Sequence, residues 1–156
     1  MKIKWKPLII SVAIPLLVGG LSALLTRDSM QTFDQITKPP LSPPGWLFPV
    51  VWTILYTLMG IASYLILTAD VPTGEKKLPL TVYAVQLAVN FFWSILFFNF
   101  ELYLFSFVWL VLLWLLIITT IIAFGKISKP AAWLLIPYLL WVTFAGYLNF
   151  AIYLLN

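Results

Sequence analysis

The chain has 156 residues, of which 63% are hydrophobic, 17% aromatic and only 9% charged. Soluble domains carry about 25% charged residues, so this composition excludes an ordinary water-facing surface. A helix of about 20 apolar residues spans the hydrocarbon core of a bilayer, and the length therefore suits five crossings with short connections. We predict an all-α polytopic membrane protein, a five-transmembrane-helix bundle that forms a single domain over residues 1–156.

Missing residue types exclude several kinds of chemistry. The sequence contains no cysteine and no histidine, which removes disulfides, thiolate catalysis and the commonest metal ligands. All carboxylates lie in the connections between apolar runs, at Asp28, Asp34, Asp70, Glu75 and Glu101. We therefore predict no metal site, no required cofactor and no ordinary acid–base catalysis. The net charge of +4 reflects the Lys and Arg bias of membrane loops and does not indicate nucleic acid as a partner.

Five apolar runs occupy residues 8–26, 47–69, 79–99, 104–125 and 131–154. Each run is close to the length of a membrane-spanning helix, and none shows the alternation typical of a membrane barrel. The first run follows three lysines, as the core of a secretory signal would. Its apolar core is too long for a typical signal, and no A-x-A cleavage site follows it, so we expect it to be a span.

The connection over residues 27–45 is the longest and is rich in proline. Pro39, Pro40, Pro43 and Pro44 favour extended backbone and stiffen this segment. Two interpretations remain open here. The segment is either a stiff linker between spans or a pre-shaped lid over the mouth of the bundle.

The distribution of cations predicts the orientation in the membrane. One side of the predicted bundle carries most of them, at Lys2, Lys4, Lys6, Lys76, Lys77, Lys126 and Lys129, whereas the other side has only Arg27 and Lys38. The positive-inside rule places the N-terminus in the cytoplasm and the C-terminus outside. The plain loops suit a bacterial cytoplasmic membrane.

Three of the runs carry polar and aromatic stripes at helical spacing. The stripes comprise Trp52, Tyr56 and Gly60 in the second run, Tyr83, Gln86, Asn90, Trp93 and Phe97 in the third, and Tyr138, Trp141, Ala145 and Asn149 in the fifth. Amides at membrane depth find no partner in lipid, so these faces should point inward. They either join the helices by hydrogen bonds or line a pocket for a flat, mostly apolar ligand.

Small residues four positions apart permit close helix contacts. Gly19 and Ala23 in the first run and Ala84 and Ala88 in the third have this spacing. We expect a homodimer, surrounded by membrane lipid.

Several segments resemble the TspO/MBR family, whose members are known as tryptophan-rich sensory proteins, translocator proteins and peripheral-type benzodiazepine receptors. The resemblance lies in KPPLSPPGW at 38–46, VWTILYTLMG at 51–60, QLAVNFFW at 86–93 and PYLLWVTFA at 137–145. It covers essentially the whole chain and implies a five-helix bundle, often dimeric, that binds porphyrins beneath the first outer loop. Some members also bind sterols and synthetic ligands.

Combined with the stripes, the resemblance gives a set of ligand-binding residues: Phe33, Trp46, Trp52, Tyr56, Gln86, Asn90, Trp93, Tyr138, Trp141 and Ala145. Four departures from the family pattern matter. Pro49 stands one residue earlier than the family's proline before Trp52. Phe33 stands where many relatives have tyrosine, and Leu41 replaces a usual tryptophan. Residues 150–156 contain no Lys or Arg, which argues against a dedicated sterol motif.

We therefore expect a membrane receptor or carrier for tetrapyrroles such as protoporphyrin IX or haem, with roles in tetrapyrrole regulation or transport. The propionates would reach donors near the outer mouth, where Arg27 and Lys38 are the only cations. Two alternatives remain: light-driven degradation of bound porphyrin, for which the family implicates positions matching Trp52 and Trp141, or binding of another apolar molecule such as a sterol. No carboxylate lies within a span to couple transport to a proton gradient.

Overall fold

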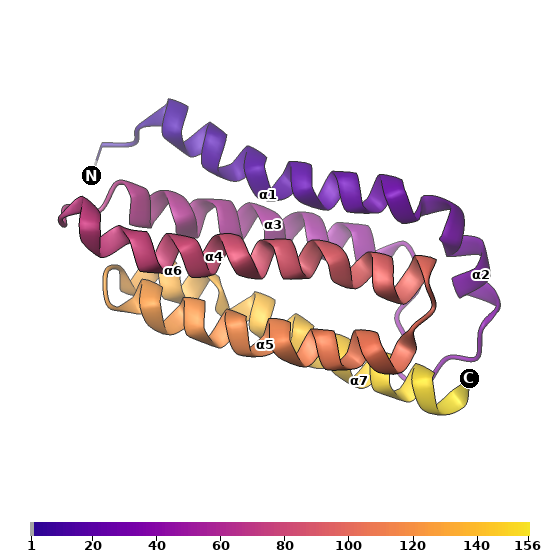
Figure 1. Cartoon of the computed structure of the whole chain (residues 1–156). Helices are drawn as coiled ribbons and strands as arrows, with labels where there is room; N and C mark the ends of the chain where they lie inside the picture. The colour runs from indigo at the N-terminus through magenta and orange to yellow at the C-terminus, as the bar shows by residue number, and fades with distance from the viewer. Residues whose placement is uncertain (1) are drawn as a thin grey trace.

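The computed structural model describes residues 2–156, and within them every regular element is helical (Figure 1). The elements in chain order are α1 (Trp5–Thr26), the 3₁₀ turn η1 (Arg27–Ser29), α2 (Met30–Gln35), α3 (Leu47–Leu67), α4 (Thr73–Ser94), the π-helical turn η2 (Ile95–Asn99), α5 (Tyr103–Gly125), α6 (Lys129–Leu134) and α7 (Ile136–Leu155). Five helical stretches in this part of the chain are long and apolar enough to cross a membrane. The predicted fold class is confirmed.

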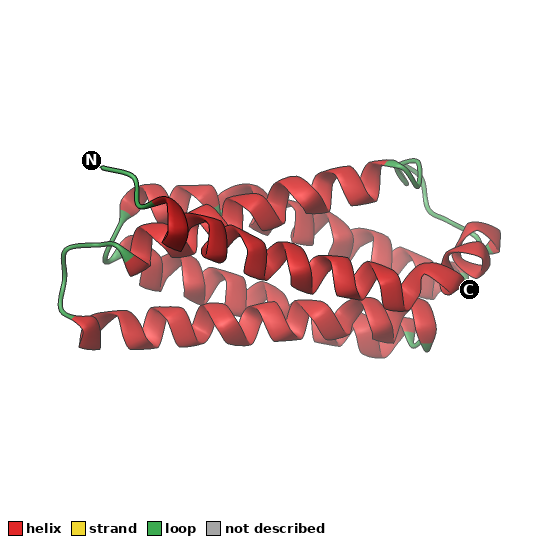
Figure 2. Ribbon diagram, turned by 90° about the horizontal axis from the view of Figure 1, so that it is seen from above, coloured by secondary structure: helices red, strands yellow, loops and turns green. Residues whose placement is uncertain are grey.

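The long helices lie side by side along one axis (Figure 2). Their packing contacts close into a ring. α1 packs against α3 and α4, α4 packs against α5, and α5 packs against α6 and α7. The short helix α6 completes the ring by packing against α3. The core therefore lies between the helices, and large apolar side chains cover the outside of the bundle, as a lipid environment requires.

The two ends of the bundle differ in charge and structure (Figure 1). The N-terminus and the α3–α4 and α5–α6 connections lie at what we call the lysine end, where all lysines other than Lys38 occur. The opposite end, here named the loop end, contains residues 27–46, the η2–α5 connection and the C-terminus. The fold therefore gathers these lysines at one end of the bundle, as the predicted orientation in the membrane requires.

Two glycines allow α1 to lie close to α3. A Cβ placed on Gly60 would lie 2.4 Å from Val12 Cα, so the backbones of the two helices meet at this point. A Cβ on Gly19 would lie 2.2 Å from the Tyr56 ring. Gly19, from the first predicted pair of small residues, therefore contacts another helix of the same chain. Ala84 and Ala88, the second pair, are exposed on α4. The homodimer stays a prediction.

The structure corrects the predicted boundaries in three places. The connection after the first span is helical through η1 and α2, and becomes extended only at Ile36. The third span begins at Thr73 rather than 79, directly after Pro72, whose backbone is extended. Lys76 in its first turn donates a 2.8 Å hydrogen bond to the carbonyl of Leu67 at the end of α3. The fifth span is interrupted at Leu135, because Pro137 lacks an amide hydrogen for the helical ladder.

Candidate functional site

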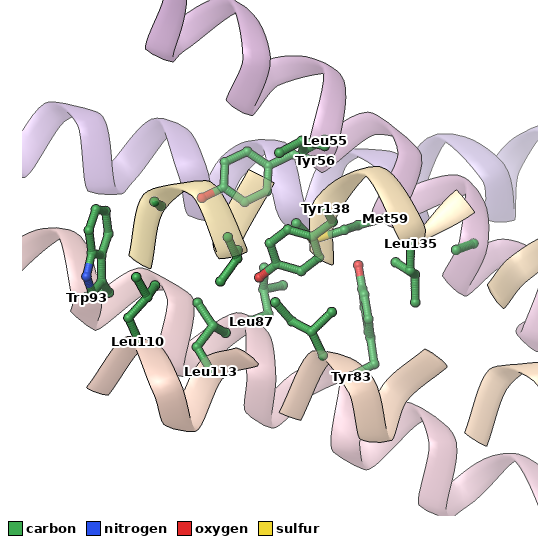
Figure 3. Packing of buried hydrophobic residues seen from close by; sticks show 14 of the residues in the cluster. Leu55, Tyr56, Met59, Tyr83, Leu87, Trp93, Leu110, Leu113, Leu135 and Tyr138 are labelled. Atoms are coloured by element: carbon green, nitrogen blue, oxygen red, sulfur yellow. The ribbon is translucent and has the colours of Figure 1, made fainter. Parts of the chain in front are cut away.

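A chain of hydrogen bonds between side chains of α3, α4 and α7 crosses the centre of the bundle. The Tyr56 hydroxyl of α3 donates to Asn90 Oδ1 at 2.8 Å, and Asn90 Nδ2 donates to the Tyr138 hydroxyl of α7 at 2.7 Å. Tyr138 in turn donates to Gln86 Oε1 at 2.7 Å. Figure 3 shows the Tyr56 and Tyr138 side chains pointing into this shared interior. We call these four residues the polar floor.

The polar floor confirms the predicted inward orientation of the amides. Gln86 and Asn90 are 1% and 2% exposed, respectively. Gln86 Nε2 also lies 4.0 Å from Met59 Sδ, a distance consistent with a weak hydrogen bond to sulfur. Because these polar groups satisfy one another, α3, α4 and α7 are joined without exposing a polar atom to lipid.

Aromatic rings cover the polar floor on the side of the loop end. Trp52 stacks on Tyr56 with ring centroids 5.4 Å apart and an interplanar angle of 27°. The same indole meets Tyr138 edge to face at 6.2 Å. Trp52 lies one turn before Tyr56 on the inward face of α3, so its position follows directly from helical spacing.

A second group of rings, the loop-end aromatic cluster, closes the bundle beyond Trp52. It consists of Phe33, Phe48, Phe97, Phe98 and Trp141. Phe33 contacts Phe48, Phe97 and Phe98 with centroid distances of 6.5, 5.9 and 5.2 Å, respectively. Phe48 then meets Trp141 at 5.9 Å. Four elements, α2, α3, α7 and η2, therefore supply one continuous aromatic surface.

The π-helical turn η2 positions its part of this cluster. A π turn widens the helix by one residue and is often found at functional sites. Here it is held against α1 by Asn99, whose Nδ2 donates to Leu25 O at 3.1 Å and whose Oδ1 accepts a 2.5 Å hydrogen bond from Ser29 Oγ. These contacts fix Phe97 and Phe98 beside Phe33.

Trp93 stacks on Phe97 of the cluster, with ring centroids 5.3 Å apart, while its indole nitrogen belongs to a second hydrogen-bonded group. Its indole nitrogen donates to Asn149 Oδ1 at 3.0 Å, and Asn149 Nδ2 donates to Tyr103 O at 2.8 Å. Ser106 Oγ donates a 3.2 Å hydrogen bond to the same Asn149 oxygen. These bonds join α4, α5 and α7, so the polar atoms of Trp93 and Asn149 are engaged in holding the bundle together.

Two side chains, from Tyr147 of α7 and from Asn156 directly after it, fasten the proline-rich segment at the loop end. The Tyr147 hydroxyl donates to Pro40 O at 2.8 Å. Asn156 makes a two-point contact with the backbone of Thr37, accepting from its amide at 3.2 Å and donating to its carbonyl at 2.8 Å. This segment, residues 36–46, therefore forms an ordered cover at the end of the bundle, and we call it the covering segment. Its fastening favours the lid over the linker interpretation.

Two hollows on the surface of the bundle lie away from the loop-end aromatic cluster. A groove of about 340 Å³ runs between α5 and α7, with Trp114, Tyr147 and Phe150 around Gly146. A shallow hollow of about 640 Å³ lies on the outer face of α4, beside Leu80, Ala84 and Ala88. The predicted site between the helices is instead filled by the chain's own aromatic side chains.

The structure brings together most of the predicted ligand-binding residues. Ala145 is 8% exposed and lies one helical turn from Trp141. Trp46 is 68% exposed at the start of α3, a position suited to the membrane interface.

Sequence reasoning missed Phe48, which links Phe33 to Trp141. Its position four residues before Trp52 is the signal that would have identified it.

These observations define the class: an integral membrane protein of five helices, with a buried aromatic and polar site at one end of the bundle. The sequence matches the TspO/MBR family over residues 11–155, and the chain belongs to this family.

Similar proteins come from all three domains of life. "Tryptophan-rich protein TspO" of Chlorobaculum tepidum is 41% identical over 150 residues, covering 96% of this chain and 95% of the relative. The protein of the same name from Archaeoglobus fulgidus is also 41% identical over 150 residues, covering 96% of each chain. "Translocator protein" of Bos taurus is 38% identical over 148 residues, covering 94% of this chain and 88% of the relative.

Proposed function

We propose that this protein is a membrane receptor or carrier that binds porphyrins between its helices, against the loop-end aromatic cluster and Trp52. Family membership supports the broader role of membrane receptor or transporter. The observation that carries the narrower proposal is that aromatic rings gather at this end of the bundle interior, in the loop-end aromatic cluster and in Trp52, which stacks on the polar floor. A flat macrocycle has large apolar faces, and aromatic side chains provide matching faces for stacking.

Binding requires the loop-end rings to move, because they fill the space between the helices. Phe33 and Phe48 are the rings to displace, since Phe48 packs on Trp141 and Phe33 packs on Phe48. Exposed hydrogen bonds at Tyr147 and Asn156 hold the covering segment. Segments fastened by a few exposed bonds open at a lower free energy than the bundle core. The ligand therefore enters at the loop end, which would face away from the cytoplasm in the orientation predicted by the positive-inside rule.

Protoporphyrin without iron is a suitable ligand for this site. The chain offers neither histidine nor cysteine to bind haem iron, so stacking rather than metal ligation would dominate the affinity. Iron-free protoporphyrin should therefore bind at least as tightly as haem. A clear preference for haem, with an iron-ligand spectrum lost on a Tyr or Met substitution, would contradict this expectation.

The proposal is tested by titrating the protein in lipid nanodiscs with protoporphyrin IX in the dark. Binding is followed through the porphyrin Soret band, so that tryptophan substitutions do not remove the signal. Trp52→Phe and Trp141→Phe are compared with Trp133→Phe, a matched control because Trp133 is 71% exposed at the lysine end. Saturable binding that weakens in the first two variants and not in the control supports the proposal. Non-saturating curves for the parent protein would refute it.

A further inference from the structure

Lys38 holds a positive charge against the loop-end aromatic cluster. Its Nζ lies 4.9 Å from the centroid of the Phe33 ring, within the range of a cation–π contact. The same ammonium donates to the carbonyl oxygens of Asp34 at 3.1 Å and Ile36 at 3.5 Å. These bonds anchor the half-buried side chain at the end of α2.

No carboxylate neutralises this charge within the described residues 2–156, where the one ion pair joins Arg27 to Asp28 at 4.0 Å. The side chains of that pair are 71% and 100% exposed, respectively. The partners of Lys38 are neutral backbone carbonyls. Asp34 and Glu101 lie at the same end but are exposed, so water screens their fields. Lys38 is therefore the loop-end cation that lies against the aromatic cluster without an acidic partner among the described residues.

The opposite side of the proposed site is neutral and already satisfied. The polar floor consists of amides and hydroxyls whose hydrogen bonds are made to one another. A carboxylate placed there would lose its hydration and meet no cation. A ligand with charge on one edge must therefore direct that edge toward the loop end.

One donor within the cluster itself has no hydrogen-bond partner in the part of the chain that the structure describes. Trp141 Nε1 is buried and has no hydrogen-bond acceptor among residues 2–156. Trp141 contacts Phe48, which contacts Phe33 beneath the Lys38 ammonium. An unpaired buried donor is costly, and an acceptor supplied by a ligand would remove that cost.

We propose that Lys38 receives a carboxylate of the ligand and thereby sets both ligand class and orientation. The ligand class is a flat apolar body with carboxylates on one edge. That edge lies at the loop end, and the uncharged edge lies toward the polar floor. This inference rests on the proposed porphyrin binding and adds to it a specificity residue.

The test compares protoporphyrin IX with its dimethyl ester, which keeps the macrocycle and removes both charges. Dissociation constants for the two are measured in nanodiscs for the parent protein, Lys38→Met, Lys38→Arg and Arg27→Met. For each variant, the ratio of the two dissociation constants is compared with the ratio for the parent protein. This comparison cancels the different partition of the acid and the ester into lipid. Arg27→Met is the matched control, since it removes the exposed cation of the same end.

The expected result is that Lys38→Met weakens binding of the free acid about tenfold or more, the effect of losing a charge-assisted hydrogen bond. Binding of the ester stays unchanged in this variant, Lys38→Arg retains the preference for the acid, and Arg27→Met behaves as the parent. An equal loss for both ligands, or no loss for either, would overturn the role of Lys38 while leaving porphyrin binding in place. Failure of the parent to bind either porphyrin would overturn the proposed function and this inference with it.

Discussion

The hydroxyl of Tyr56 and the side-chain amide of Asn90 are joined by a 2.8 Å hydrogen bond in the interior of the bundle. Asn90 uses its other end to donate to Tyr138, so a single amide connects α3 with α7 through α4. A Cβ on Gly19 would meet the Tyr56 ring, which shows that α1 packs directly behind this bond. The site and the helix packing therefore share the same residues.

Replacing Asn90 should destabilise the bundle. Asn90→Leu leaves the Tyr56 and Tyr138 hydroxyls without this partner, at an expected cost of about 1–3 kcal/mol in the free energy of unfolding. The measurement is unfolding in mixed micelles, with Tyr56→Phe and the double variant completing a cycle. We expect a coupling energy of about 0.5–1.5 kcal/mol between the two residues. Strictly additive effects would show that the bond contributes nothing to stability.

Trp93 and Trp141 should respond differently to substitution by phenylalanine. Trp93→Phe breaks the bond to Asn149 and should lower the free energy of unfolding by about 1 kcal/mol, with porphyrin affinity nearly unchanged. Trp141→Phe loses an unpaired indole and should weaken porphyrin binding with little effect on unfolding. Soret titrations and unfolding curves for both variants check this division. The reverse pattern would mean that Trp93 is the ligand contact.

Gly60 should not tolerate even a methyl group. Gly60→Ala places Cβ against the α1 backbone, at 2.4 Å from Val12 Cα, and the helices must separate. Overpacking of this kind costs roughly 1–3 kcal/mol or more. Gly20→Ala is the control, because a Cβ there meets nothing within 4 Å and the helix should gain up to about 1 kcal/mol. Thermal unfolding of the two variants in detergent provides the comparison, and equal melting temperatures would refute the close approach.

Leu41 occupies a strained backbone position in the covering segment. Its φ is 71°, and Ser42 N donates to Pro39 O at 3.4 Å, as in a type II turn whose third residue favours glycine or asparagine. A left-handed conformation costs leucine about 1–2 kcal/mol. Because Leu41 is 80% exposed, Leu41→Asn should be neutral or stabilising by up to about 1 kcal/mol in unfolding experiments. Marked destabilisation would instead show that the leucine side chain is anchored in the membrane interface.

Loosening the cover should speed ligand exchange. Tyr147→Phe keeps the ring and removes only the bond to Pro40, so opening becomes easier by about 1 kcal/mol, or roughly fivefold. Stopped-flow measurements with protoporphyrin should show faster association and faster dissociation. Tyr153→Phe is a suitable control, since Tyr153 is 39% exposed and its ring meets Phe150. Unchanged rates in Tyr147→Phe would show that the cover does not control access.

Local sequence patterns accounted for much of this molecule. Hydropathy and length were enough to predict five spans, because each span meets the bilayer independently of its neighbours. Spacing was enough to predict that Gln86, Asn90 and Trp141 lie on inward helix faces, since the helical period determines which residues share a face. The helix α2 was not predicted, because the four prolines that follow it favour extended backbone and the whole connection was expected to be extended.

Partnerships between helices were decided only by the tertiary structure. Sequence placed Trp93 and Trp141 in equivalent stripes, yet Asn149 satisfies one indole and leaves the other unpaired. Phe48 acquired its role because α3 brings it between Phe33 and Trp141, which lie far away in the chain. The period of a helix states which way a side chain faces. Which atoms it meets there depends on the order of helices around the ring and on close approaches such as that at Gly60, and these are properties of the packed bundle.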